Sequence, residues 1–339
     1  MDFIGAARPS IADPILPKKI DEGRIEDIRE CIGCNICVTG DMTMSLSRCT
    51  QNSSFMEEWR KGWHPETIKT KQSDAKVLVV GAGPAGLSAA HKVGLRGYEV
   101  AMAEATAELG GRVTRESKLP GLNAWARVRD YRQGQIAKMA NVNIYRDSAL
   151  TADDVLGFGF EHVAIATGAR WRRDGIARYN LLPIPLAASM PIFTPDELMA
   201  GSLPSGEVVV YDDDHYYMGS VLAELLVQKG CKVTFITPAS RVAEWSFNTL
   251  EQGTIQARML EIGVNVKVTR GLASVESDGV TAVCSYTGKP ERIGCDAVVM
   301  VTARLPEDGL FLALKARQEE WADSGIASVK VIGDANAPA

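Results

Sequence analysis

Residues 76–86 read KVLVVGAGPAG, and this stretch decides the fold of the 339-residue chain. The apolar run over 77–80 has the length of a buried strand, and a helix-like stretch continues from the glycines to Arg96. A second strand is expected over 99–104, ending in Glu104. A strand, a glycine loop, a helix and a second strand that ends in an acid together predict a dinucleotide-binding unit.

Each residue type in this loop has a physical role beside a nucleotide. Gly81 allows the tight turn, Gly83 lets the backbone approach a pyrophosphate, and Gly86 lets the helix pack closely on the strand. The phosphates would lie at the helix N-terminus, where free N–H groups and the helix dipole favour negative charge. An acid in the position of Glu104 can hold the ribose hydroxyls. We therefore predict that ADP or a complete dinucleotide binds at Gly81, Gly83, Pro84, Ala85, Gly86 and Glu104.

Three further turns are expected to approach the same nucleotide. A Gly-Gly-Arg turn at 110–112 follows Glu104, and a strand over 163–166 ends in a turn of small residues. A last strand is followed by a Gly-Asp turn at 333–334, which in flavoproteins approaches the ribityl-phosphate side of the flavin. These turns add six candidates to the nucleotide site: Gly111, Arg112, Thr167, Gly168, Gly333 and Asp334.

A second strand–helix–strand unit is predicted over 207–211, 218–229 and 232–237. Where its phosphate loop should stand, residues 212–217 read DDDHYY. Carboxylates would repel a pyrophosphate, because one like-charge pair at about 4 Å costs about 4 kcal/mol at an effective dielectric constant of about 20. Thr237 stands where an acid would hold the ribose. We predict an inserted domain that keeps the NAD(P)-binding fold but has lost NAD(P)H binding.

The cysteines indicate an iron–sulfur cluster. Three of them lie two residues apart in Cys31-Ile-Gly-Cys34-Asn-Ile-Cys37, and Cys49 follows after eleven residues. Four thiolates hold a [4Fe–4S] cluster in this way, whereas structural zinc more often shows two separated Cys-x2-Cys pairs. Structural zinc remains the alternative. Three single cysteines in strand-like stretches are expected to be small core residues: Cys231, Cys284 and Cys295.

Composition excludes several classes of protein. With 37 Lys+Arg against 42 Asp+Glu the net charge is −5, and no basic tract favours nucleic-acid binding. No apolar run approaches the roughly 18 residues of a membrane helix, and no signal peptide opens the chain, so we expect a cytoplasmic protein without a membrane anchor. The length suggests about two domains.

These features together resemble the trimethylamine dehydrogenase family of iron–sulfur flavoproteins, which includes dimethylamine and histamine dehydrogenases and is related to the 2,4-dienoyl-CoA reductases. The tight spacing between Cys34 and Cys37 resembles the amine dehydrogenases, as does the missing NAD(P) loop. Besides the cysteines and the glycine loop, the matching stretches are GAARPSIADP at 5–14, CTQN at 49–52, RKGWHP at 60–65 and ATGARW at 166–171.

The resemblance implies a longer protein. Residues 2–4 are predicted to end a buried strand, and the pattern over 11–23 predicts a helix closed by Gly23. In this family an N-terminal β/α barrel carries FMN and the amine site, and residues 2 to about 24 would be its last strand and helix. Arg8 matches a residue of the FMN-phosphate segment. The cluster would pass electrons from FMN to an electron-transfer flavoprotein, and the glycine-loop domain would hold ADP or FAD. The full-length protein would be a homodimer.

The predicted fold class is α/β, with two Rossmann-like nucleotide-binding domains of the FAD/NAD(P)-binding type, one inserted in the other. A barrel remnant (1–30) and a 4Fe–4S segment (31–72) precede them. The first nucleotide domain comprises 73–192 and 304–339, and the inserted, degenerate domain comprises 193–303. Both ends of the chain suggest a segment of a larger protein.

The favoured function is therefore the electron-transfer and nucleotide-binding portion of an amine dehydrogenase. Two alternatives stay open: a fragment of an NAD(P)H-dependent ene reductase with FAD, and a non-catalytic nucleotide-binding module with structural zinc. We name no catalytic residue, because the acid–base groups of amine oxidation would lie in the missing barrel, and we expect the chain alone to be inactive. His64 is expected to pack or hydrogen-bond near the cluster, and His215 to have no acid–base partner.

Overall fold

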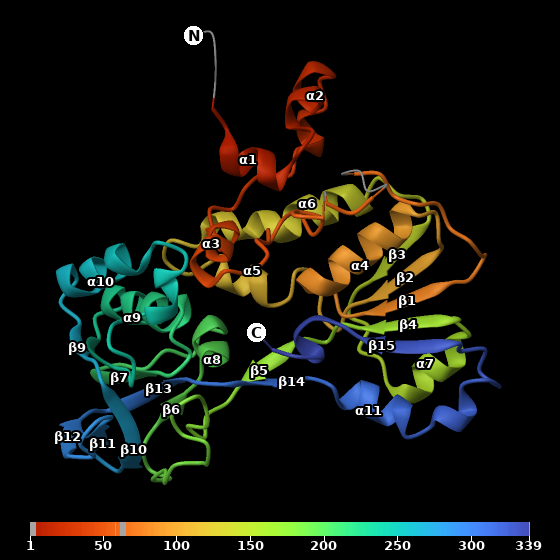
Figure 1. Ribbon diagram of the computed structural model, residues 1–339. Coiled ribbons are helices and arrows are strands. Elements are labelled where there is room, and N and C mark those ends of the chain that lie inside the picture. Colours follow the sequence, from red (N-terminus) through yellow and green to blue (C-terminus); the bar gives the residue numbers. More distant parts are fainter. Residues whose placement is uncertain (1–4, 58, 62–65, 339) are drawn as a thin grey trace.

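A parallel five-stranded sheet forms the first half of the molecule in the computed structural model, which describes residues 5–57, 59–61 and 66–338 (Figure 1). The strand order is β15-β4-β1-β2-β3, and every neighbouring pair is parallel. The strands are β1 (Val77–Val80), β2 (Val100–Ala103), β3 (Val142–Tyr145), β4 (His162–Ile165) and β15 (Ser328–Val331).

Helices cover both faces of this sheet because the residues of its strands alternate between two apolar layers. Val77 and Val79 of β1 pack with α4 (Pro84–Leu95) and α6 (Ala126–Ile136). Leu78 and Val80 pack on the opposite face, with α7 (Ala152–Phe158) and α11 (Gly309–Lys315). The predicted strands and the helix after the glycine loop are confirmed, and so is the α/β fold class.

A second parallel sheet has the order β6-β13-β7-β8-β9. One face packs against α9 (Tyr217–Gln228) and α10 (Gln252–Glu261), and the other against a three-stranded antiparallel sheet. The strands of the parallel sheet are β6 (Ile192–Phe193), β7 (Glu207–Asp212), β8 (Lys232–Ile236), β9 (Asn265–Lys267) and β13 (Ala297–Val301), and those of the antiparallel sheet are β10 (Arg270–Glu276), β11 (Gly279–Cys284) and β12 (Pro290–Gly294).

Two short antiparallel strands, β5 (Ala169–Trp171) and β14 (Arg304–Pro306), join the two halves (Figure 1). The chain enters the second half after β5 and returns through β14, as an inserted unit requires. Two short helices face each other across the junction: α5 (Arg112–Glu116) and α8 (Pro195–Met199). The domain limits given above stay a prediction.

The segment that precedes the first sheet folds into short helical pieces, of which the first two lie at one end of the molecule (Figure 1). The prediction of one helix over 11–23 is wrong, because the structure has α1 (Ala7–Ala12) and α2 (Leu16–Asp21). The break lies at Asp13, whose backbone is extended. Pro14 follows it, and a proline disfavours the helical conformation in the residue before it. The strand expected at 2–4 and the Gly62–Pro65 motif with His64 lie outside the described residues.

Among the described residues, the remaining helical pieces are one short α-helix and six 3₁₀ turns. They are α3 (Thr39–Thr43), η1 (Ile25–Asp27), η2 (Ile36–Val38), η3 (Asn123–Trp125), η4 (Glu244–Phe247), η5 (Gln318–Glu320) and η6 (Gly333–Ala335). In the described ranges, no helix has the length and apolarity needed to cross a bilayer.

The three single cysteines divide into two groups. Cys231 and Cys295 are buried core residues, as predicted. The prediction is wrong for Cys284, which is only half-buried at the end of β11. Hydrogen bonds from Thr287 and from the backbone of Tyr286 lower the pKa of its thiol to about 7.

Candidate functional site

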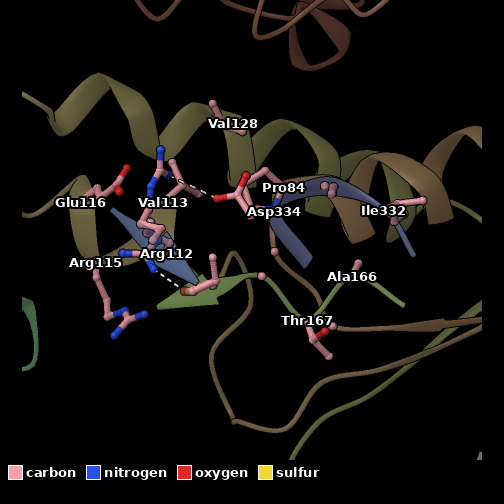
Figure 2. Close-up of a pocket in the computed structure, with 18 of the residues that line it drawn as sticks. Pro84, Arg112, Val113, Arg115, Glu116, Val128, Ala166, Thr167, Ile332 and Asp334 are labelled. Atoms are coloured by element: carbon pink, nitrogen blue, oxygen red, sulfur yellow. Dashed lines mark hydrogen bonds and ion pairs between the residues drawn. The ribbon is translucent and has the colours of Figure 1, made fainter. Parts of the chain in front are cut away.

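A cavity of about 900 Å³ opens at the carboxyl ends of β1, β2 and β4, between the first sheet and the second half of the molecule (Figure 2). Ligands of open α/β sheets bind at this edge. The structure brings eleven of the predicted nucleotide-site residues to its wall: Gly81, Gly83, Pro84, Ala85, Glu104, Gly111, Arg112, Thr167, Gly168, Gly333 and Asp334. Gly86 does not line it, and Arg8, which was predicted for the FMN phosphate, lies at a different cavity.

The glycines of the loop differ in what surrounds them. Gly81 has φ of +99°, and a Cβ there would lie 2.5 Å from the carbonyl oxygen of Ala166. A Cβ on Gly86 would lie 1.8 Å from the carbonyl oxygen of Gly81, so Gly86 serves helix–strand packing behind the cavity. A Cβ on Gly83 would meet nothing within 4 Å, because this glycine faces the open cavity. This geometry fits a ligand approaching Gly83; binding itself stays a prediction.

Glu104 is held at the cavity wall by the backbone. Its carboxylate accepts hydrogen bonds from the N–H of Ala82 at 2.8 Å, and from the N–H and hydroxyl of Thr106 at 3.0 and 2.9 Å. A carboxylate offers about four acceptor positions, so an oxygen lone pair remains for a ribose hydroxyl. The contact with Ala82 also fixes the glycine loop relative to β2.

Two other predicted nucleotide-site residues, Arg112 and Asp334, form ion pairs within the protein. Arg112 pairs with Asp196 at 2.8 Å (Nη1 to Oδ1) and also donates to the carbonyl of Ala169. Asp334 pairs with Arg304 at 3.4 Å (Oδ2 to Nη1; Figure 2). Both ion pairs therefore lie at the wall of the cavity.

The end of the cavity toward the second half carries residues that sequence reasoning missed. The hydroxyl of Tyr217 donates to Glu116 at 3.1 Å, and burial raises the pKa of the Glu116 carboxyl to about 7, partly offset by the charge of Arg112. Trp125 packs edge-on against Tyr217 with ring centroids 4.6 Å apart. Glu116 and Tyr217 are far apart in the sequence, so no local pattern could have paired them.

In the second half, residues 212–217 join β7 to α9, and two of their carboxylates are buried. Asp212 is fully buried and accepts the N–H of His215 at 3.2 Å. A Cβ on Gly219 would lie 2.8 Å from its carboxyl carbon, so the carboxylate sits against the first turn of α9. Asp213 lies 3.1 Å from His215 (Oδ1 to Nε2), so the prediction that this histidine has no partner is wrong.

The four predicted ligand cysteines surround one small cavity together with Arg8, Asn35 and Gln51. Burial raises the pKa of Cys34 and Cys37, and the neighbouring thiols add to the effect. The N–H of Gly33 donates to Cys31 at 3.4 Å, and the hydroxyl of Thr50 lies 3.3 Å from the sulfur of Cys34. Four thiols around one space fit the donor set of an iron–sulfur cluster.

A site for a single metal ion needs a tighter arrangement of ligands than a site for a cluster does. Zinc needs its ligand atoms within about 2.3 Å of one point. Within the described ranges, no three or more His, Cys, Asp or Glu side chains are placed to hold one metal ion. Arg8 lies on the cysteine cavity, where its guanidinium donates to Asn35, while Cys34 and Thr50 also line the large cavity.

Two sequence families match the chain. Residues 75–182 match the family described as pyridine nucleotide-disulphide oxidoreductase, and residues 193–294 match the OYE-like second alpha/beta domain. Both are families of flavin-dependent oxidoreductases, which indicates a flavin or nucleotide cofactor. The border between the two matches lies next to β6.

The most similar relatives include amine-oxidising enzymes. Dimethylamine dehydrogenase of Hyphomicrobium sp. (strain x) is 41% identical and covers 100% of this chain. The structure of histamine dehydrogenase from Rhizobium sp. 4-9 is 62% identical with a TM-score of 0.98, and that of 6-hydroxypseudooxynicotine amine oxidase from Pseudomonas geniculata N1 is 48% identical with a TM-score of 0.95. Both structures match the whole chain.

The chain spans about half the length of these relatives: 50%, 53% and 50% respectively. A reductase, 2-naphthoyl-CoA reductase, matches 98% of the chain and 47% of its own length at 26% identity, with a TM-score of 0.80.

Proposed function

Because the chain belongs to the trimethylamine dehydrogenase family, as a C-terminal portion of it, we propose that it is the electron-transfer and nucleotide-binding portion of an iron–sulfur flavin amine dehydrogenase. One observation carries the proposal: the cysteine cavity and the nucleotide cavity share a wall at Cys34 and Ile36. A cluster held at the first would therefore lie at the wall of the cavity proposed for the nucleotide.

Each residue group has a role in this proposal. Cys31, Cys34, Cys37 and Cys49 would hold a [4Fe–4S] cluster, which supplies one-electron transfer when bound. In the full-length protein, electrons would enter from FMN in the N-terminal barrel and leave to an electron-transfer flavoprotein. The reaction would be oxidative N-demethylation or deamination of a small amine. We also propose a cytoplasmic location and a homodimer.

The nucleotide is proposed to be ADP, with FAD as the alternative. The loop at Gly83 and the Glu104 carboxylate suit an ADP moiety, which both ligands contain. Similarity to the amine dehydrogenases favours ADP, whereas the Gly333–Asp334 turn at the cavity wall would suit FAD.

An ene reductase is the second candidate, and the segment before α9 in the second half of the molecule argues against it. Such an enzyme needs NAD(P)H, and this segment carries three carboxylates (Asp212, Asp213 and Asp214) that would repel a pyrophosphate. The reductase 2-naphthoyl-CoA reductase is also the more distant relative, at 26% identity. A nucleotide-binding module with structural zinc is the third candidate, and measuring which metal the protein binds distinguishes it from the first.

The test is to read the coding sequence upstream of Met1 and to express the longer protein. We expect an in-frame barrel, and bleaching of its FMN by a small amine such as dimethylamine or histamine, followed by reduction of an electron-transfer flavoprotein. A matched Cys34→Ser variant should still show amine-dependent FMN bleaching but no transfer to the acceptor. Reduction of an activated alkene with NAD(P)H, without amine oxidation, would contradict the proposal.

A further inference from the structure

Arg132 of α6 carries a buried positive charge, since the residue is only 7% exposed. Its guanidinium donates five hydrogen bonds, and all five acceptors are neutral oxygens. They are the hydroxyl of Ser88 at 2.6 Å, the side-chain carbonyl of Gln51 at 2.8 Å, and the backbone carbonyls of Val128 at 2.8 Å, Thr50 at 3.2 Å and Gln51 at 3.4 Å.

Three of these contacts place the guanidinium directly behind the cysteine segment. Thr50 and Gln51 are the two residues that follow Cys49, and Gln51 lines the cysteine cavity. The hydroxyl of Thr50 lies 3.3 Å from the sulfur of Cys34. Arg132 therefore touches the same short stretch that carries one ligand cysteine and contacts a second.

The charge of Arg132 lacks a counter-charge of its own in the described part of the chain. Burial lowers the pKa of its guanidinium to about 10 and the charge of Arg29 adds to this, but the group stays protonated at neutral pH. Arg29 is itself paired with Glu66 at 2.6 Å. Burying an unpaired charge is costly unless a negative group lies nearby. Four thiolates around iron provide such a group.

We propose that Arg132 sets the reduction potential of the cluster, by holding a fixed positive charge behind the Cys49–Gln51 segment that stabilises the reduced state. The proposal rests on the function proposed above. When the cluster gains one electron from a reductant its net charge becomes more negative by one, and no bond or proton moves. A buried cation favours the more negative state, and charge and hydrogen bonding to sulfur are known determinants of cluster potentials.

The experiment is a redox titration of the anaerobically reconstituted 339-residue chain, with dithionite as reductant and cluster absorbance and electron paramagnetic resonance as readouts. Three variants are compared with the natural sequence. Arg132→Gln removes the charge and keeps an amide donor toward Thr50 and Gln51, whereas Arg132→Lys keeps the charge. Arg127→Gln is the matched control, because Arg127 lies on the same helix and donates to the carbonyl of Cys31 at 3.1 Å, but is 44% exposed and paired with Glu30.

We expect Arg132→Gln to lower the equilibrium constant for reduction at least tenfold, which is 59 mV for a one-electron couple. Arg132→Lys and Arg127→Gln should stay within about threefold, because one keeps the buried charge and the other removes a charge that solvent already screens. Iron content and thermal unfolding of each variant show whether it is folded and loaded. If Arg132→Gln takes up no iron, Arg132→Met replaces it, since it fills the same space without a charge.

Two results would overturn the inference. An iron-loaded neutral variant at position 132 with an unchanged potential would show that the charge does not act on the cluster. An equal shift in Arg132→Lys would assign the effect to hydrogen bonding instead of charge. A natural-sequence chain that takes up no iron would remove the proposed function itself, and this inference with it.

Discussion

Replacing Gly83 by valine should weaken nucleotide binding by one to two orders of magnitude while leaving the fold intact. The backbone at Gly83 is extended, with φ of −70° and ψ of −178°, so any residue can adopt it without strain. A Cβ there meets no atom within 4 Å. The free energy of unfolding should therefore fall by no more than about 1 kcal/mol, the loss expected because valine is a poorer N-cap than glycine at the start of α4.

The effect on binding follows from the contacts that a pyrophosphate would lose. A hydrogen bond from a backbone N–H to a charged phosphate contributes about 1.5–3 kcal/mol. A valine side chain in the cavity moves the phosphates away from the N-terminus of α4, so at least one such bond is lost. At about 1.4 kcal/mol per factor of ten, the affinity should fall about 10- to 150-fold.

Gly86→Ala is the matched control. It adds a smaller side chain three residues away, which should destabilise the fold without filling the cavity. Its Cβ would lie 1.8 Å from the carbonyl oxygen of Gly81, so the turn itself must move. Overpacking of this kind costs about 1–3 kcal/mol, which should lower the unfolding temperature.

The assay is calorimetric titration of ADP into nucleotide-free protein, with thermal unfolding measured on the same samples. The reasoning is refuted if Gly83→Val binds ADP as tightly as the natural sequence, or if its unfolding temperature falls as much as that of Gly86→Ala.

Three further predictions concern the cysteines, the second half and the cavity wall. Cys34→Ser should lose cluster colour and iron while ADP still binds; surviving colour would show that the ligand assignment is wrong. NADH and NADPH should show no micromolar binding in a fluorescence titration, because the three carboxylates of residues 212–214 would repel a pyrophosphate, and micromolar binding of either would contradict that explanation. Since the folded pKa of Glu116, about 7, lies above its ordinary value of 4.5, the free energy of unfolding should fall by up to about 3 kcal/mol as the pH rises from about 4.5 to about 7. Glu116→Gln should reduce that fall in denaturant titrations, and an unchanged pH profile would refute the burial argument.

The first sheet could be predicted from sequence because its signals are local. The run over 77–86 contains strand, turn and helix start in one continuous pattern, and the structure has them in that order. The wrong helix over 11–23 came from counting apolar positions through Pro14, although proline breaks the helix at that point.

The site was less predictable because its decisive contacts join distant segments. Glu116 meets Tyr217 only after the second half has folded against the first. Arg132 donates hydrogen bonds to Ser88 on one side and to Gln51 on the other. The spacing of these residues in the sequence does not predict that a guanidinium is buried between them. Side-chain pairs across elements depend on packing, which periodicity does not encode.

The most direct test of the account is the iron and acid-labile sulfide content of the chain after anaerobic reconstitution, determined together with the bound nucleotide. The account predicts about four iron and four sulfide per chain, a brown protein that dithionite bleaches, and one adenine nucleotide. Colourless protein that takes up only zinc, or no metal, would contradict it.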